Sequence, residues 1–296
     1  MKFLVTVIGI VAVSTASIII RLSEAPALTL ATYRLGLSAL VMLPYFLYAE
    51  GYKKWDRRDV KLFLLTSFFL AFHFIFWISS LRYTSILNST ILVTLNPIFV
   101  TFFSFILFKK IPGRGIIFGI LLALSGSFIL YYQPSPSLNG QVFPQALLGN
   151  SLALTGGVFA SLYLICTSIL RKRYNLISFV FPVYGFTFLI LAMFTLLSST
   201  KLTGFNSREY LIFILFALIP QIVGHTSFNW ALKLFSPNFI ALAILGEPIG
   251  ATMLGLIIFK EIPTPWAILG AVMILMAILV SGREEGEKIK NRMPSR

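Results

Sequence analysis

The chain has 296 residues, of which 57% are hydrophobic and 11% are charged. Soluble domains contain about 25% charged residues, so this composition excludes a water-soluble globule and indicates a membrane protein with several spans. The net charge of +14 does not indicate nucleic-acid binding, because the basic residues stand in short loops between apolar runs, as in the cytoplasmic loops of membrane proteins.

Ten apolar runs follow one another along the chain, and each is long enough to cross a hydrocarbon core of about 30 Å. We expect all ten to be helices, because an open strand in lipid would leave its backbone groups unpaired. The expected spans are 3–20, 28–48, 62–81, 85–107, 115–132, 147–169, 177–198, 210–231, 236–258 and 265–281. The first run resembles a signal peptide, but the many spans that follow it favour a first helix that is retained.

The distribution of basic residues predicts the orientation in the membrane. With the N-terminus inside, the cytoplasmic segments hold eighteen of the 24 Lys and Arg residues, the opposite side holds five, and Arg34 falls within the second span. Because Lys and Arg are retained on the cytoplasmic side, we expect a multi-pass protein of the cell membrane with both termini in the cytoplasm.

The most polar connection, residues 133–145, lies near the midpoint of the chain. We expect it to link two halves of five helices each, residues 1–132 and residues 146–282. A basic cytoplasmic tail, residues 283–296, is expected to follow the second half.

A comparison of the two halves supports a repeat. With an offset of 151 residues, Leu81–Leu124 aligns without gaps on Leu232–Leu275, and Pro97 meets Pro248. Five is an odd number of spans, so the halves must lie upside-down relative to each other. The expected fold is therefore an all-α membrane protein with ten transmembrane helices in two inverted five-helix repeats, an architecture typical of secondary transporters.

Short motifs in both halves carry a family resemblance. They are LATYRLGLSAL at 30–40, LNPI at 95–98, GEPI at 246–249 and FKEIPTPWAILG at 259–270. With these motifs in this order, nearly the whole chain resembles the EamA-type transporters of the drug/metabolite transporter superfamily. The resemblance implies a ten-helix carrier that moves small organic metabolites, often outward, by alternating access.

The chain departs from the family pattern at one acidic position. The first half has Lys110 where the family usually has Glu, whereas the second half has Glu261 at the matching place. This difference argues against a symmetric role for that position.

Glu247 is followed at once by Pro248 in the middle of an apolar run. An acidic residue near the centre of a span costs about 2.5–3.5 kcal/mol, so its side chain is expected to face protein or water rather than lipid. Proline removes a backbone donor and frees the carbonyl group of Ile244, which predicts a kink. The functional interpretation is a carboxyl group that binds substrate or a proton; the alternative is a Glu that only packs between helices.

Other polar side chains within spans are candidates for the same site. Asn96 is the counterpart of Glu247 in the first half and can orient a substrate, or make an interhelical hydrogen bond instead. His73 and Trp77 share a helical face, as do His225 and Asn229, because each pair is spaced i, i+4. Each histidine is a candidate cavity group or a packing group. Two histidines without a carboxylate at ligand spacing make a poor metal site, so no metal is expected.

Arg34 and three aromatic residues complete the candidates. Arg34 either extends its charged end to the interface, or binds an anionic group or pairs with Glu247. The candidates for stacking on a flat substrate are Trp77, Tyr163 and Trp230.

These features favour a secondary transporter of amino acids or similar metabolites, with export as its direction and protons as a candidate coupling ion. A channel or scaffold is the alternative, although the spans carry isolated polar points rather than a continuous polar stripe. An intramembrane enzyme is less favoured, because no HExxH motif, paired carboxylates or Gly-rich phosphate loop occurs. No cofactor is expected. The expected partners are a small-molecule substrate and the lipid bilayer, not nucleic acid.

Overall fold

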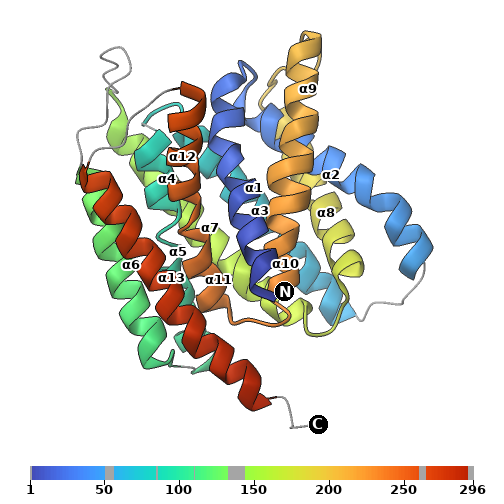
Figure 1. Ribbon diagram of the computed structural model, residues 1–296. Helices are drawn as coiled ribbons and strands as arrows, with labels where there is room; N and C mark the ends of the chain where they lie inside the picture. Colours follow the sequence, from blue (N-terminus) through green and yellow to red (C-terminus); the bar gives the residue numbers. More distant parts are fainter. Residues whose placement is uncertain are drawn as a thin grey trace.

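The computed structural model describes residues 2–50, 57–84, 86–109, 111–132, 144–259 and 265–292. These residues form helices and loops but no strand (Figure 1). The helical elements are α1 (Lys2–Leu22), α2 (Ala27–Glu50), α3 (Arg57–Ser80), α4 (Ile86–Val93), α5 (Asn96–Phe108), α6 (Arg114–Tyr132), α7 (Ala146–Leu170), α8 (Leu176–Leu197), α9 (Ser207–Phe216), the π-helical segment η2 (Ala217–His225), α10 (Thr226–Ala231), α11 (Pro237–Ile244), α12 (Glu247–Phe259) and α13 (Pro265–Arg292).

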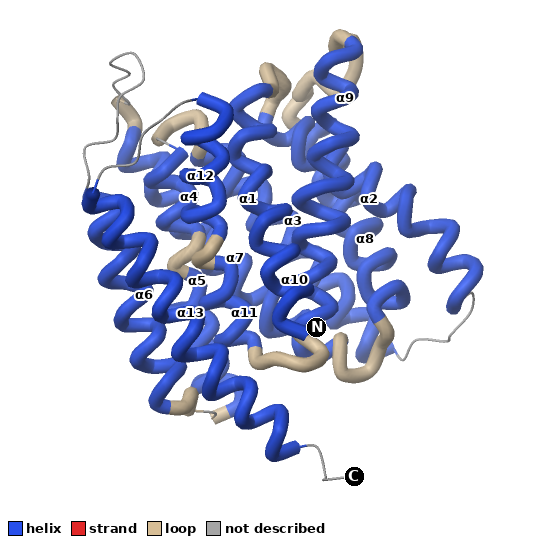
Figure 2. Tube along the Cα trace, viewed as in Figure 1, coloured by secondary structure: helices blue, strands red, loops and turns tan. Residues whose placement is uncertain are grey.

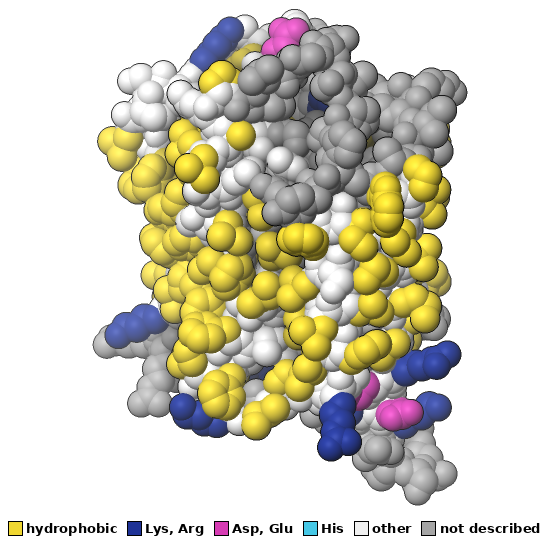
Figure 3. Space-filling model, turned by 90° about the vertical axis from the view of Figure 1, so that its left-hand side faces the viewer, with side chains coloured by type: hydrophobic (Ala, Val, Ile, Leu, Met, Phe, Trp, Pro, Cys, Tyr) yellow, Lys and Arg dark blue, Asp and Glu magenta, His cyan; other side chains and the backbone are white. Residues whose placement is uncertain are grey.

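The elements group into ten rods, because α4 leads into α5, α9 into η2 and α10, and α11 into α12. Among the described residues, eight helices are long and apolar enough to cross a membrane, and α6 adds the shorter apolar stretch Arg114–Ile129. The expectation of an all-helical, multi-pass membrane protein is therefore confirmed. Figure 3 shows a broad band of hydrophobic side chains, with most charged side chains on this face gathered at its lower end.

Two rods are interrupted, one at Glu247-Pro248, where the sequence predicted a kink, and one at the matching Asn96-Pro97. In place of a bent helix, α4 ends at Val93 and α5 begins at Asn96, while α11 ends at Ile244 and α12 begins at Glu247. Tight turns replace the helical pattern here, since Leu245 donates its N–H to the carbonyl group three residues back. Figure 2 shows both interruptions as short loops about halfway along the bundle.

The two prolines explain why new helices begin at these points. Pro97 and Pro248 each occupy the second position of the helix that follows the interruption. A proline in the first turn costs no hydrogen bond, because the N–H group it lacks would have no partner within the helix. At Pro248 the structure therefore differs from the expected kink, because Pro248, like Pro97, lies at the start of a new helix and does not bend a continuous one.

The helices of the two interrupted rods begin and end at corresponding residues. Adding 151 to the first and last residues of α4 and α5 gives the first and last residues of α11 and α12. The contacts between helices correspond in the same way. Helix α2 contacts its counterpart α8, and α6 contacts its counterpart α13. The contact of α3 with α7 corresponds to the contact of α1 with η2 and α10. The inverted repeat stays a prediction, and these correspondences agree with it.

Helix α13 continues to Arg292, well past the expected end of the tenth span. Residues 283–292 of the expected tail are therefore helix, and residues 293–296 lie outside the described part. The Glu284 carboxylate accepts hydrogen bonds from the N–H groups of Gly115 at 2.6 Å and Ile116 at 3.3 Å. A carboxylate is favoured there because the start of a helix carries a partial positive charge, so the end of α13 caps α6.

Glu285 makes the corresponding contact with another helix. Its carboxylate accepts a 2.5 Å hydrogen bond from the N–H group of Ser236, directly before α11. The Ser236 hydroxyl oxygen in turn accepts from the N–H group of Phe239 at 3.3 Å, which caps α11. The adjacent acids thus connect α13 to the starts of α6 and α11, near the end of the molecule where both termini lie (Figure 1).

Parts of the sequence interpretation lie outside the described residues. They are residues 133–143 of the expected linker, Lys110, and residues 260–264, which include Glu261.

Candidate functional site

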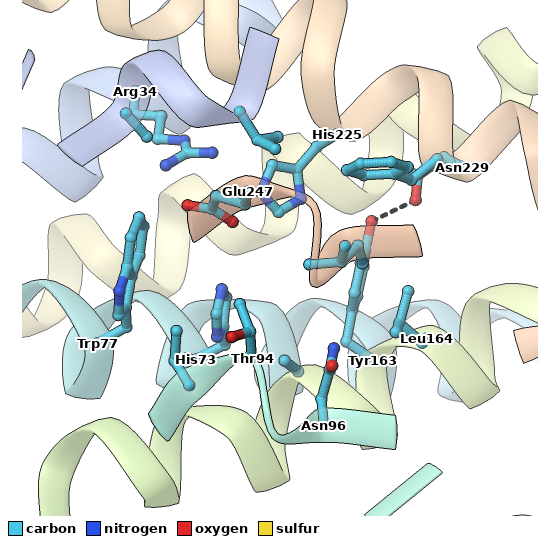
Figure 4. A pocket seen from close by; sticks show the side chains of 16 residues that line it. Arg34, His73, Trp77, Thr94, Asn96, Tyr163, Leu164, His225, Asn229 and Glu247 are labelled. Atoms are coloured by element: carbon cyan, nitrogen blue, oxygen red, sulfur yellow. Dashed lines mark hydrogen bonds between the residues drawn. The ribbon is translucent and has the colours of Figure 1, made fainter. Parts of the chain in front are cut away.

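A cavity lies inside the bundle, where α1, α2, α3, α7, η2 and α10 meet the two interrupted rods (Figure 4). Its volume is about 50 Å³. Since one water molecule needs about 10–15 Å³ on this measure, the cavity encloses only a small space in this conformation. Both halves of the chain line it, through Val13, Ala16, Arg34, His73, Trp77, Val93, Thr94, Asn96, Ala160, Tyr163, Leu164, His225, Phe228, Asn229, Ile244 and Glu247.

Eight of the nine candidates drawn from the sequence line this cavity. They are Arg34, His73, Trp77, Asn96, Tyr163, His225, Asn229 and Glu247. The exception is Trp230, which is half-buried, packs against the apolar core and does not line the cavity. Substrate binding by these residues stays a proposal.

The helix interruptions place Asn96 and Glu247 in the cavity wall. Each is the first residue of the helix that follows an interruption, and each is almost fully buried. Among the described residues, neither Asn96 Oδ1 nor Glu247 Oε1 has a hydrogen-bond partner. An unpartnered buried polar atom costs about 1–3 kcal/mol, so these two oxygens are candidates for contact with a ligand or an ion.

Arg34 does not extend its charged end to the membrane interface. Its side chain is fully buried, and its Nε donates a 2.6 Å hydrogen bond to Gln221 Oε1. The guanidinium carbon lies 4.2 Å from the ring centroid of Phe74 and 4.6 Å from that of Phe216. Cation–π contacts of this kind hold a desolvated guanidinium in place.

The outer nitrogens of Arg34 remain available. Neither Nη1 nor Nη2 has a hydrogen-bond partner within the part of the chain that the structure describes. The suggested pair with Glu247 is therefore not formed, although both side chains line the same cavity and Figure 4 shows them close to each other.

Gln221 is a residue of this site that the sequence analysis missed. It lies on the π-helical segment η2, directly after Pro220, and is completely buried. Proline disturbs the regular helical pattern, and π-helical turns are frequent at functional sites. An amide within the apolar span 210–231 was the signal that could have identified it.

The two histidines lie close to each other and to aromatic rings. Their ring centroids are 6.4 Å apart, and the rings of His73 and Trp77 are stacked at 5.9 Å with an angle of 4°. His73 Nδ1 donates a 3.0 Å hydrogen bond to the carbonyl oxygen of Gly156. No group of three or more potential metal ligands occurs among the described residues.

Tyr163 and Asn229 form a hydrogen-bonded wall. The Tyr163 hydroxyl donates to Asn229 Oδ1 at 2.7 Å, and Asn229 Nδ2 donates to the Tyr184 hydroxyl at 3.3 Å. The Nε of the buried Arg171 donates to the backbone carbonyl of Asn229 at 2.8 Å. This side of the cavity is thus internally satisfied, in contrast to the side with Arg34 and Glu247.

Comparisons with known proteins match nearly the whole chain. A model of the EamA-like transporter family matches residues 2–132 and 147–283. An "Uncharacterized transporter" of Clostridium kluyveri is 27% identical over 68% of this chain, and the chain spans 65% of that protein's length. The Bacillus subtilis "Uncharacterized transporter YyaM" is 21% identical over 85% of this chain and 83% of its own length.

A solved crystal structure has the same fold. It superposes with a TM-score of 0.78 over 97% of this chain and 98% of that chain, at 16% sequence identity. At this identity the likeness concerns the fold alone.

Proposed function

The chain belongs to the EamA-like transporter family, and from this premise we propose that it is a secondary transporter that moves small organic metabolites across the cell membrane by alternating access. Amino acids or similar molecules are the proposed substrates, and export is the proposed direction. The observation that carries the proposal is the buried cavity between the two interrupted helices, which contains a guanidinium group and a carboxyl group that are not paired with each other. Substrate sites of secondary transporters are built at such interrupted helices near the bilayer midplane.

Two inverted five-helix halves are the proposed architecture. The matching bounds of the interrupted rods and the paired helix contacts support it. In such a molecule one half rocks against the other around a fixed site, which opens the site to each side in turn.

Both termini are proposed to lie in the cytoplasm. They lie at the same end of the bundle (Figure 1), and the excess of Lys and Arg in the loops assigned to that side supports this orientation.

Counterflow in proteoliposomes tests the transport function. Vesicles containing the purified chain are loaded with a metabolite extract and diluted into a labelled form of each candidate substrate. A carrier will accumulate label transiently, at a rate that saturates and rises with internal substrate. Label that only equilibrates, at a rate independent of internal substrate, would identify a channel and contradict the proposal; protein-free vesicles are the control.

A further inference from the structure

A buried carboxylate at the start of α9 ties that helix to the loop between α1 and α2. Glu209 is only 2% exposed. It accepts a 2.5 Å hydrogen bond from the Ser23 hydroxyl group and a 3.1 Å hydrogen bond from the N–H group of Glu24. Hydrogen bonds to a charged group are about twice as strong as those between neutral groups. This contact therefore fixes the start of α9, in the second half of the chain, to a loop of the first half.

Asp59 makes the corresponding contact at the other end of the bundle. It is buried in the first turn of α3 and accepts hydrogen bonds from Arg173 Nη1 at 2.6 Å and from the Tyr174 hydroxyl group at 2.8 Å. With the offset of 151 residues between the halves, Ser23 and Tyr174 are counterparts. In Figure 1, α1 leads from the N-terminal end of the bundle to the Glu209 contact, whereas α3 begins at the N-terminal end. The two acids thus hold the third rod of each half at opposite ends of the molecule.

The far end of each third rod turns into an interrupted rod and makes weaker contacts with the other half. At the corner between α3 and α4, Thr84 Oγ1 donates a 2.8 Å hydrogen bond to Asn150 Oδ1. At the corner between α10 and α11, the Phe235 ring lies 5.0 Å from the Phe3 ring on α1. These contacts join neutral groups, so they separate at a lower cost than a buried charge that loses its partners.

We propose that Asp59 and Glu209 are pivots, each of which holds one end of its rod while the corner at the opposite end moves and opens the cavity to one side. This inference rests on the proposed transport function and specifies which contacts persist while access alternates. The moving corners lead directly into α4 and α11, which end at Val93 and Ile244 in the cavity wall. Movement of a corner therefore changes the cavity wall itself.

Two pairs of cysteines at the same end of the bundle test the proposal by cross-linking. Both pairs are placed in a Cys166→Ser background, because Cys166 is the only cysteine of the chain. The pivot pair is Ser23→Cys with Glu209→Cys, and the corner pair is Thr84→Cys with Asn150→Cys. A short bis-methanethiosulfonate reagent links each pair in proteoliposomes, and a reducing agent removes the link.

Counterflow of an isotope-labelled metabolite extract is measured for each pair before and after reduction. The linked corner pair is expected to exchange at least tenfold more slowly than its reduced form. The linked pivot pair is expected to exchange at least as fast as its reduced form, because the link replaces the lost carboxylate contact. If the pivot link blocks exchange reversibly, the acid contact must break during transport and the proposal is overturned. Unchanged exchange in the linked corner pair would overturn it too.

Distances between spin labels separate this inference from the transport function, because they need no substrate. Labels at the exposed Leu22 and Ser207 span the pivot, and labels at the exposed Arg82 and Leu147 span the corner. We expect one distance across the pivot and two across the corner in detergent micelles. Two distances across the pivot, or one across the corner, would contradict the proposed movement. If the expected distances are found but neither reduced pair exchanges any solute, the pivots stand and the transport function fails.

Discussion

The hydroxyl group of Ser14 lies 3.2 Å from the backbone carbonyl oxygen of Glu247, while its shorter hydrogen bond, of 2.7 Å, goes to the carbonyl oxygen of Ile10 in its own helix. Ser161 is placed in the same way, because its hydroxyl lies 3.2 Å from the carbonyl oxygen of Asn96 and makes its shorter hydrogen bond, of 2.7 Å, to the Gly157 carbonyl oxygen of its own helix. Each serine stands on the first helix of one half, and each carbonyl belongs to the residue that resumes the interrupted helix of the other half. The two contacts therefore tie each half to the other at the level of the cavity.

Replacing these serines by alanine should destabilise the protein by a modest amount. We expect Ser14→Ala and Ser161→Ala each to lower the free energy of unfolding by about 0.6–2 kcal/mol, the range for hydrogen bonds between membrane helices. Reversible denaturation in mixed micelles measures this change. Ser125→Ala is the control, because among the described residues the exposed Ser125 hydroxyl donates only to the Leu121 carbonyl oxygen of its own helix; an equal loss in the control would contradict the interhelical role.

Gly126 should not tolerate a methyl group. A Cβ atom there would lie 2.7 Å from the carbonyl oxygen of Gly270 on α13, a backbone atom that cannot turn away. We expect Gly126→Ala to separate α6 from α13 and to cost about 1–3 kcal/mol. At Gly185, no atom of another described part of the chain lies within 4 Å of the added methyl group, so the same substitution should stabilise α8 by up to about 1 kcal/mol. Opposite signs of the two changes in unfolding free energy are the expected result.

Several features of the fold and the site could be predicted from the sequence. The helices could be predicted from the hydrophobic runs, because a helix in lipid forms all its backbone hydrogen bonds within its own segment. Glu247 and Asn96 could be predicted as inward-facing, because a polar group that contacts lipid is costly.

Other features depend on tertiary contacts that a single sequence does not contain. From the sequence, Arg34 could lie either at the membrane interface or in the interior. The buried position depends on contacts with residues distant in sequence, namely the hydrogen bond to Gln221 and the rings of Phe74 and Phe216. Trp230 shares a helix with Asn229, yet it packs into the apolar core, because a spacing of one residue turns a side chain by about 100° around a helix. The spacing of residues along one helix does not determine which neighbouring helix packs against each of its faces.

The contribution of Glu284 to the free energy of unfolding should change with pH in the acid range. Burial opposes ionisation of its carboxyl group, but the Lys288 ammonium group and the N–H groups of Gly115 and Ile116 outweigh burial and hold the pKa below its usual value of 4.5. The stabilisation is therefore complete above that value and is lost as the pH falls through the lowered pKa. Glu284→Gln should cost about 1 kcal/mol at neutral pH and little at acid pH.

Unfolding measured across the acid range tests this dependence on Glu284. Glu287→Gln changes an exposed acid on the same helix and provides the control. A Glu284→Gln variant that kept the full acid-side loss of stability would contradict the assignment.

Gln221 should act by positioning Arg34. In Gln221→Leu the Arg34 Nε loses its hydrogen-bond partner, which costs about 1–3 kcal/mol in a buried place and allows the guanidinium group to move. We expect the half-saturating substrate concentration in proteoliposomes to rise more than the maximal rate falls. Gln221→Glu keeps an acceptor oxygen at this position and should restore much of the substrate affinity. If both variants lost transport equally without a change in half-saturation, Gln221 would have a merely structural role.

Glu247 is the residue through which we expect protons to couple to transport. Its unpartnered Oε1 faces the cavity, where a carboxyl group can exchange a proton as access alternates. Transport driven by an imposed pH gradient should therefore disappear in Glu247→Gln, while exchange of substrate against substrate persists, because exchange needs no net proton movement. Flux in proteoliposomes with and without the gradient measures both activities. Glu285→Gln serves as the control, and an undiminished response to the gradient in Glu247→Gln would show that protons do not couple through this residue.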